Sequence, residues 1–319
     1  MSESATELPG AEGPAPGPGF TPEVDLRAAT TGVTAGEAIT VAFAGTIDRL
    51  VEEQAKVRLM ADVHSVHQAR VATRRLRSDL RTFEVLFEPG SGDHLRAELA
   101  WMGELLGRVR DADVMVARLE LGLDGQASAD PANADFIERI SRERGRAQLQ
   151  LLAALDSERW ASLLRSLMAL ARNPPLATVA DAPADAFLPL IAAQPWDRLS
   201  RAVAKLNGDA ADEELHQVRI AAKRARYAAE AVVSVVGRPA ERFAEAVADL
   251  QTALGDYNDA VASADWLRGA AGDMDAPTAF VAGTLSQHQR TLARKSRRRW
   301  PKAWKQLNRK KLNAWFGRA

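Results

Sequence analysis

Apolar side chains recur every three or four residues along most of the chain, which is the spacing that one face of an α-helix requires. The first such run follows Thr34, a residue type that often caps a helix N-terminus, and includes Ile39, Phe43, Ile47 and Leu50. No stretch alternates apolar and polar residues for long enough to predict a β-strand. The pattern therefore predicts an all-α fold.

Interruptions in the apolar pattern divide the rest of the chain into further helices. In the first half we expect one helix that contains residue 67 and stops before Pro89, followed by helices at 93–119, 136–155 and 160–170. A link with prolines at 174, 175 and 183 comes next. In the second half we expect helices at 187–206, 216–236, 239–267 and 276–299, and a last helix that carries Trp300, Trp304, Leu307 and Trp315.

The first 32 residues are rich in Gly, Pro, Ala and Glu and have no apolar period. Such a segment buries too little surface to offset the entropy lost on ordering, so we expect a disordered leader at 1–32. The proline-rich link is expected to divide the helical part into a first half at 33–172 and a second half at 173–319.

One predicted helix carries a row of cationic side chains, called here the basic row: His67, Arg70, Arg74, Arg77 and Arg81. Their spacing places them on one helix face over roughly 20 Å, with neighbours about 5 Å apart. At an effective dielectric near 20, two unit charges at that distance repel by about 3 kcal/mol. Solvated helix faces usually include acids, but here Asp79 is the one acid between residues 67 and 81. The row therefore predicts an anionic ligand, and guanidinium groups favour phosphate.

The basic row recurs at an offset of 149 residues. Segment 216–226, HQVRIAAKRAR, repeats segment 67–77, HQARVATRRLR, with His, Gln, Arg, Ala, Arg and Arg identical. A second landmark follows each copy, Leu106-Gly107-x-x-Arg110-Asp111 in the first half and Leu254-Gly255-x-x-Asn258-Asp259 in the second. Two landmarks in the same order favour an internal duplication and predict two antiparallel helical bundles related by a pseudo-twofold axis.

The double motif, H-x-x-R-[VI]-A-x-[RK]-R-x-R followed by L-G-x-x-[RN]-D, resembles the CHAD family, the conserved histidine α-helical domain, over residues 33–316. The resemblance implies two four-helix bundles whose basic residues line a central groove. It also implies inorganic polyphosphate as the ligand and association with polyphosphate granules.

The ligand-binding face that the resemblance implies combines both motif copies. The first half is expected to supply His67, Arg70, Arg74, Arg75 and Arg77, with Arg81 from the end of the row and Arg110 from the second landmark. The second half is expected to supply His216, Arg219, Lys223, Arg224 and Arg226. Glu230 stands where the first copy has Arg81, and Asn258 stands where it has Arg110. The second row is therefore shorter or ends in an ion pair, and the halves need not contribute equally.

Charge and composition narrow the possible partners and compartments. The chain has 42 Lys and Arg against 42 Asp and Glu, but segment 290–318 holds 12 cations and no acid, so the charge is strongly polarised. The absence of cysteine excludes disulfides, thiol catalysis and thiolate metal sites. The sequence shows neither a signal peptide nor a membrane span, so we expect a cytoplasmic protein with no membrane partner.

A metal site is one alternative that the sequence raises. His64 and His67 could place two imidazoles on one ion, but the second copy has Glu213 in place of His64. We therefore predict no metal ligands.

Phosphohydrolase activity is another alternative. Asp111, Asp113, Asp256 and Asp259 could hold Mg²⁺ for hydrolysis of polyphosphate or triphosphate, or they could orient arginines through ion pairs. Because the sequence has no P-loop or other nucleotide motif, we favour the orienting role. The prediction is a non-enzymatic binding protein without catalytic residues or cofactors.

The aromatic residues of the tail raise a third alternative. Trp300, Trp304 and Trp315 lie among basic residues and could stack on bases, which would make the protein bind nucleic acid such as RNA. The spacing 300, 304, 307 instead favours an apolar stripe that docks the last helix. Polyphosphate is therefore the predicted partner and nucleic acid the second choice.

Overall fold

The computed structural model describes residues 32–59, 63–122, 131–207, 210–272 and 274–317, and these residues confirm the predicted all-α class. They contain no β-strand and only two isolated β-bridges, Thr34–Pro183 and Phe87–Leu176. The α-helices are α1 Ala35–Arg58, α2 Val63–Thr82, α3 Asp93–Gly122, α4 Pro131–Leu155, α5 Glu158–Arg172, α6 Ala184–Ala204, α7 Asp212–Ala231, α8 Val233–Val236, α9 Arg238–Ala271, α10 Ala276–Arg297, α11 Trp300–Leu307 and α12 Lys310–Asn313. Short 3-10 turns lie at Glu84–Leu86, Thr178–Asp181 and Ala314–Phe316. None of the described helices combines the length and the apolar character needed to cross a bilayer.

The start of α1 follows the capping rule that the sequence indicates. The Thr34 hydroxyl accepts a hydrogen bond from the Glu37 backbone N–H at 3.2 Å, and the Glu37 carboxylate accepts one from the Thr34 N–H at 2.9 Å. This reciprocal pair satisfies two of the four N–H groups that a helix N-terminus leaves unpaired. The first helix therefore begins where its sequence predicts.

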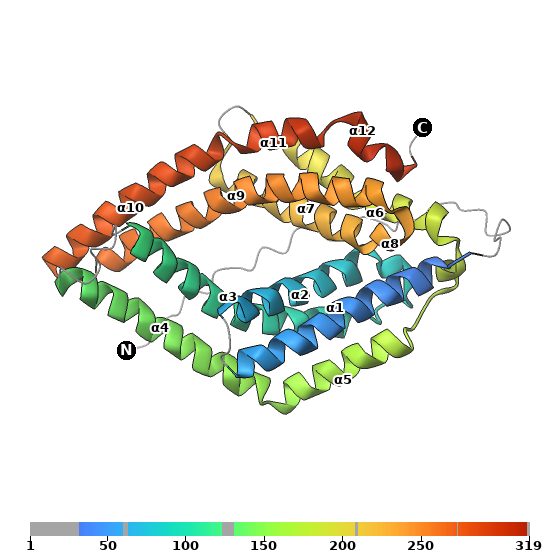
Figure 1. The fold of residues 1–319 in the computed structure, drawn as a ribbon, viewed down its shortest axis with the longest axis horizontal. Helices are drawn as coiled ribbons and strands as arrows, with labels where there is room; N and C mark the ends of the chain where they lie inside the picture. The colour runs from blue at the N-terminus through green and yellow to red at the C-terminus, as the bar shows by residue number, and fades with distance from the viewer. Residues whose placement is uncertain (1–31, 60–62, 123–130, 208–209, 273, 318–319) are drawn as a thin grey trace, which may run out of the picture.

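The helices form two groups that meet along α2 and α7. In Figure 1, α1 to α5 lie in the lower part of the view and α6 to α12 in the upper part, while α4 and α10 meet at the left end. Helix α2 packs between α1 and α3, and α7 packs between α6 and α9. One hydrophobic cluster, which includes Phe43 and Leu76 from the first group and Phe187 and Phe243 from the second, runs through both. The two basic helices are thus held by a continuous apolar core.

The structure corrects several predicted boundaries. The helix expected to run to residue 236 ends at Ala231, and α8 follows separately. Helix α4 begins at Pro131, five residues before its predicted start at residue 136, because proline is well tolerated in the first helical turn. The predicted leader lies outside the described residues except for Gly32.

The predicted last helix is instead three short pieces, α11, α12 and the 3-10 turn Ala314–Phe316. In one unbroken helix, Trp304 and Trp315 would lie about 16 Å apart along the axis. In the structure they pack on the same aromatic group: Trp304 stacks on Trp196 with ring centroids 5.5 Å apart, and Trp315 meets Phe243 at 5.9 Å. Trp196 and Phe243 are themselves in edge contact at 5.4 Å. The break lets both indoles dock, which confirms the apolar role expected for the tail aromatics.

We predict that Phe243→Ala lowers the free energy of unfolding by about 3–5 kcal/mol, because Phe243 is fully buried at the centre of this aromatic group. Phe280→Ala is the matched control, since the Phe280 side chain is 78% exposed, and it should change stability by no more than about 0.5 kcal/mol. Urea denaturation of both variants measures the difference. Equal losses in the two variants would contradict the assigned core.

Candidate anion-binding site

Helix α2 separates its core-facing side chains from the basic row. Leu76 and Leu80 are at most 2% exposed. The row residues His67, Arg70, Arg74 and Arg81 are half-buried, and Arg77 is exposed. Because a helix turns once every 3.6 residues, one sequence can supply an apolar face and a cationic face at the same time.

The second motif copy lies on α7, which packs directly against α2. The Nη2 atom of Arg74 on α2 donates a hydrogen bond to the Tyr227 hydroxyl on α7 at 3.1 Å. The Nη1 atom of Arg75 forms an ion pair with a Glu230 carboxylate oxygen at 3.2 Å. These contacts hold α2 against α7, so the cations of the two motif copies lie near one another.

Lys223 on α7 lies among cations from both helices. Burial lowers the pKa of its ammonium from the ordinary value of 10.5 to about 6. Three nearby guanidinium charges act in the same direction, those of Arg74, Arg219 and Arg70, while the Asp259 carboxylate opposes them. At neutral pH this lysine is therefore largely uncharged. We call Arg70, Arg74, Arg219 and Lys223 the central cluster.

The histidines of the two copies have different neighbours. Burial lowers the pKa of the His67 imidazole, and the charge of Arg110 is the next largest cause. His216 instead hydrogen-bonds through Nδ1 to the side-chain oxygen of Asn258 at 2.7 Å. The Arg110-to-Asn258 difference noted in the sequence thus places a cation beside one histidine and an amide beside the other.

The aspartates of the second landmark lie next to arginines of the two basic motif copies. Asp111 lies 3.8 Å from Arg70 Nη2, and Asp259 lies 3.6 Å from Arg219 Nη2. The two other candidate aspartates also pair with arginines, Asp113 with Arg144 at 2.6 Å and Asp256 with Arg299 at 3.0 Å. All four carboxylates therefore occupy the arginine-orienting positions that the sequence favoured.

The glycine of the first landmark makes room for Arg70. A Cβ atom added at Gly107 would lie 3.3 Å from Arg70 Nε and Nη2, so the guanidinium rests against the α3 backbone. The same addition at Gly255 in the second copy would meet nothing within 4 Å. The motif glycine therefore has a steric role in the first half and none in the second.

Three buried N–H groups of the central cluster have no acceptor among the described residues. They are the Nε atoms of Arg70, Arg74 and Arg219. A buried donor without an acceptor is costly, and a guanidinium is an especially strong donor. These groups are suited to the oxygens of an anionic ligand.

Two predicted ligand residues instead form ion pairs within the protein. Arg226 pairs with Glu230 at 2.7 Å, so the second row does end in an ion pair at the position of Arg81. Arg75 pairs with the same Glu230 and lies 3.8 Å from the buried Asp79. Burial raises the pKa of Asp79 well above its ordinary value, although Arg75 opposes the shift. Through Glu230, Arg75 on α2 is linked to α7.

Sequence reasoning missed Arg198, an exposed residue on α6. Burial lowers the pKa of its guanidinium, and the charges of Arg81 and then Arg201 lower it further. A signal was present, because Asp197-Arg198-Leu199 repeats Asp48-Arg49-Leu50 at the same offset of 149 residues as the basic rows. A single tripeptide is too short to be recognised without the structure.

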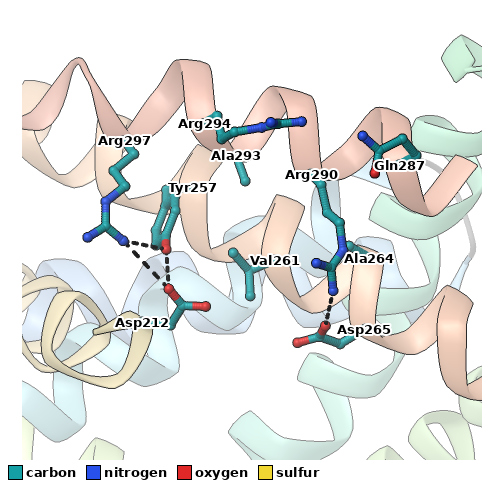
Figure 2. A pocket seen from close by; sticks show the side chains of 10 residues that line it. All are labelled: Asp212, Tyr257, Val261, Ala264, Asp265, Gln287, Arg290, Ala293, Arg294 and Arg297. Carbon is teal, nitrogen blue, oxygen red and sulfur yellow. Dashed lines mark hydrogen bonds and ion pairs between the residues drawn. The ribbon is translucent and has the colours of Figure 1, made fainter. Parts of the chain in front are cut away.

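A pocket of about 400 Å³ lies elsewhere, between α9 and α10. Figure 2 shows Arg297 reaching toward Tyr257 and Asp212, and Arg290 paired with Asp265. Two of the three arginines in its wall are thus neutralised by carboxylates. The pocket is chemically distinct from the central cluster.

The described residues contain no group of three His, Asp or Glu placed to hold a metal ion. His64 and His67 have their ring centroids 5.7 Å apart, and a nitrogen of His64 contacts the Gln68 amide at 2.6 Å. His64 therefore has the Gln68 amide and the His67 ring beside it.

These observations define an all-α protein in which basic faces of two helices meet. The chain belongs to the CHAD domain family, because the model of that family matches residues 41–268. This confirms the resemblance that the double motif indicates. The duplication and the pseudo-twofold axis remain inferences from the sequence.

Individual relatives agree with this assignment. The chain is 31% identical over 282 residues to the uncharacterized protein Rv2226 of Mycobacterium tuberculosis, a match that covers 83% of this chain and 53% of that protein. The chain thus spans about half the length of the curated relatives it matches. Its structure is similar to PptA from Streptomyces chartreusis, with a TM-score of 0.72, 24% identity and coverage of 86% of this chain and 100% of that one. The CHAD domain from the plant Ricinus communis gives a TM-score of 0.65 and 23% identity, with 92% and 94% covered. These two likenesses show the shared fold.

The lowered pKa of Lys223 predicts a pH-dependent stability difference. Between about pH 6 and 10.5 the unfolded chain holds the Lys223 proton and the folded protein does not, so this group makes wild-type stability rise with pH. Lys223→Met removes the group, so the variant should exceed the wild type in stability most near pH 6 and progressively less toward pH 10. Urea denaturation at several pH values measures the difference.

Lys295→Met is the control for that comparison, because Lys295 is an exposed lysine on α10. It should change stability little at every pH. A gain for Lys223→Met that is the same at pH 6 and pH 10 would contradict the assigned environment.

Proposed function

We propose that the protein binds inorganic polyphosphate, without catalysis, through the facing basic sides of α2 and α7. The carrying observation is the central cluster. Cations from both motif copies share one environment there, and three buried guanidinium N–H groups have no acceptor in the part of the chain that the structure describes. A flexible polyanion would supply several oxygens and negative charges at once. Membership of the CHAD family supports the choice of polyphosphate as the anion. On this proposal, the protein is cytoplasmic and associates with polyphosphate granules.

The surroundings of the tail aromatics argue against the nucleic-acid alternative. Trp304 and Trp315 pack on Trp196 and Phe243, so their rings are engaged within the protein rather than free to stack on bases. A site that recognises phosphates alone needs no such platform. Unlabelled RNA should therefore displace bound polyphosphate poorly in a competition assay.

The aspartate geometry argues against phosphohydrolase activity. Metal-assisted hydrolysis needs carboxylates free to hold an ion, and each of the four candidate aspartates faces an arginine. Their carboxylates position guanidinium groups instead. We therefore propose that these aspartates orient arginines rather than hold a catalytic metal ion.

Removing two arginines of the central cluster should weaken polyphosphate binding strongly. Arg74→Ala combined with Arg219→Ala removes two charge-assisted contacts of about 1.5–3 kcal/mol each, so the dissociation constant should rise by well over tenfold. The matched control is Lys302→Ala with Lys305→Ala, which removes the same charge from exposed positions on α11. Filter binding with long-chain polyphosphate measures both. A loss confined to the tail variant, in folded proteins, would overturn the proposed site.

Polyphosphate binding should be coupled to proton uptake by Lys223. Phosphate oxygens beside this ammonium favour its charged form, so the bound state holds a proton that the free state has lost above about pH 6. Affinity should therefore fall as pH rises from 6 to 9. Calorimetry in buffers of different ionisation enthalpy measures the protons taken up.

Lys223→Arg is the matched variant for this test, because arginine stays charged throughout that range. Its affinity should depend less on pH between 6 and 9 than that of the wild type. An identical pH profile in both proteins would remove Lys223 from the coupling.

A further inference from the structure

Four arginines from three helices gather beside the central cluster. They are Arg77 and Arg81 on α2, Arg198 on α6 and Arg224 on α7. These helices pack on one another, and Arg81 and Arg224 are half-buried, whereas Arg77 and Arg198 are exposed. Burial lowers the pKa of Arg224, and the charges of Arg81, Arg198 and Arg77 lower it further, so the other three arginines lie within electrostatic reach of Arg224.

This group differs from the central cluster in its counter-charges. In the central cluster Asp111 and Asp259 face Arg70 and Arg219. Among the residues that the structure describes, none of the four arginines forms a side-chain hydrogen bond or an ion pair. Half-buried like charges without a counter-charge destabilise the folded protein unless an anion joins them.

Resting on the proposed function, we propose that Arg198, with Arg77, Arg81 and Arg224, forms a second phosphate-binding subsite for the same polyphosphate chain. Arg81 lies seven positions after Arg74 on α2, so these two residues are about 10 Å apart along that helix. A long linear polyphosphate can occupy both, and its second contact is then effectively intramolecular. Arg198 carries the subsite onto α6, beyond both motif copies.

The structure offers a close control for Arg198. Arg49 on α1 occupies the equivalent place in the repeated Asp-Arg-Leu tripeptide and, like Arg198, is exposed. Arg49→Ala removes the same charge and the same side chain from a position outside the subsite. Any difference between Arg49→Ala and Arg198→Ala therefore reports on location rather than on net charge.

Arg198→Ala should weaken long-chain polyphosphate binding about tenfold, the value of one charge-assisted contact. The slope of log affinity against log salt should become shallower by about 0.7, as for one lost contact to a single-stranded polyanion. Without polyphosphate, the melting temperature of Arg198→Ala should equal or exceed that of the wild type, because one of four repelling charges is gone.

Arg49→Ala should match the wild type in affinity and slope. Arg198→Lys, which keeps the charge, should restore the slope but only part of the affinity, since an ammonium cannot bind phosphate bidentately.

The outcomes separate this inference from the proposed function. If Arg74→Ala weakens binding and Arg198→Ala does not, the second subsite is wrong and the proposed function stands. Equal losses for Arg49→Ala and Arg198→Ala, or a marked drop in the melting temperature of Arg198→Ala without ligand, would also overturn the subsite. If neither Arg74→Ala nor Arg198→Ala changes affinity, the proposed function itself fails.

Discussion

The packing of α2 against α7 forces positive charges together, and the rest of the molecule must hold that contact against their repulsion. Two unit charges about 5 Å apart repel by about 3 kcal/mol at an effective dielectric near 20. Fully burying one large apolar side chain contributes about 1.5–3 kcal/mol. The repulsion in each unbalanced pair of charges therefore offsets about the stabilisation that one buried apolar side chain contributes. The hydrophobic cluster that runs through both helix groups supplies this opposing stabilisation, and Leu76 and Leu80 supply part of it from the same helix as the basic row.

The protein limits the repulsion locally by three different means. Carboxylates face Arg70 and Arg219 at 3.8 and 3.6 Å. Lys223 gives up its proton near pH 6, so one charge disappears under neutral conditions. Glu230 binds Arg75 and Arg226 together and ties α2 to α7. What remains uncompensated is concentrated in guanidinium groups, which keep their charge at any relevant pH and lose less hydration than an ammonium would.

The features that could be predicted from sequence are those that depend on local spacing. The basic row follows from helical periodicity, and the first helix start follows from Thr34 and Glu37, because both depend on residues within a few turns. Arg198 could not be assigned, because its role depends on α6 packing beside α2 and α7, a tertiary fact. The break in the last helix could not be predicted for the same reason, because the contacts of Trp304 with Trp196 and of Trp315 with Phe243 join residues far apart in the sequence. The pairing of Arg75 with Glu230 likewise joins residues 155 positions apart.

The two motif copies have diverged in ways that give the binding face two chemically different ends. Gly107 supports the Arg70 guanidinium, whereas nothing lies within 4 Å of a Cβ added at Gly255, and the charges of Arg81 and Arg201 act on Arg198. The central cluster has carboxylates facing two of its arginines and contains a titrating lysine, so its charge changes with pH. The four-arginine group has no titrating member and keeps its charge constant. A linear anion that spans both groups would meet fixed charge in the four-arginine group. In the central cluster its phosphates would favour protonation of Lys223, so the strength of one contact would depend on the other.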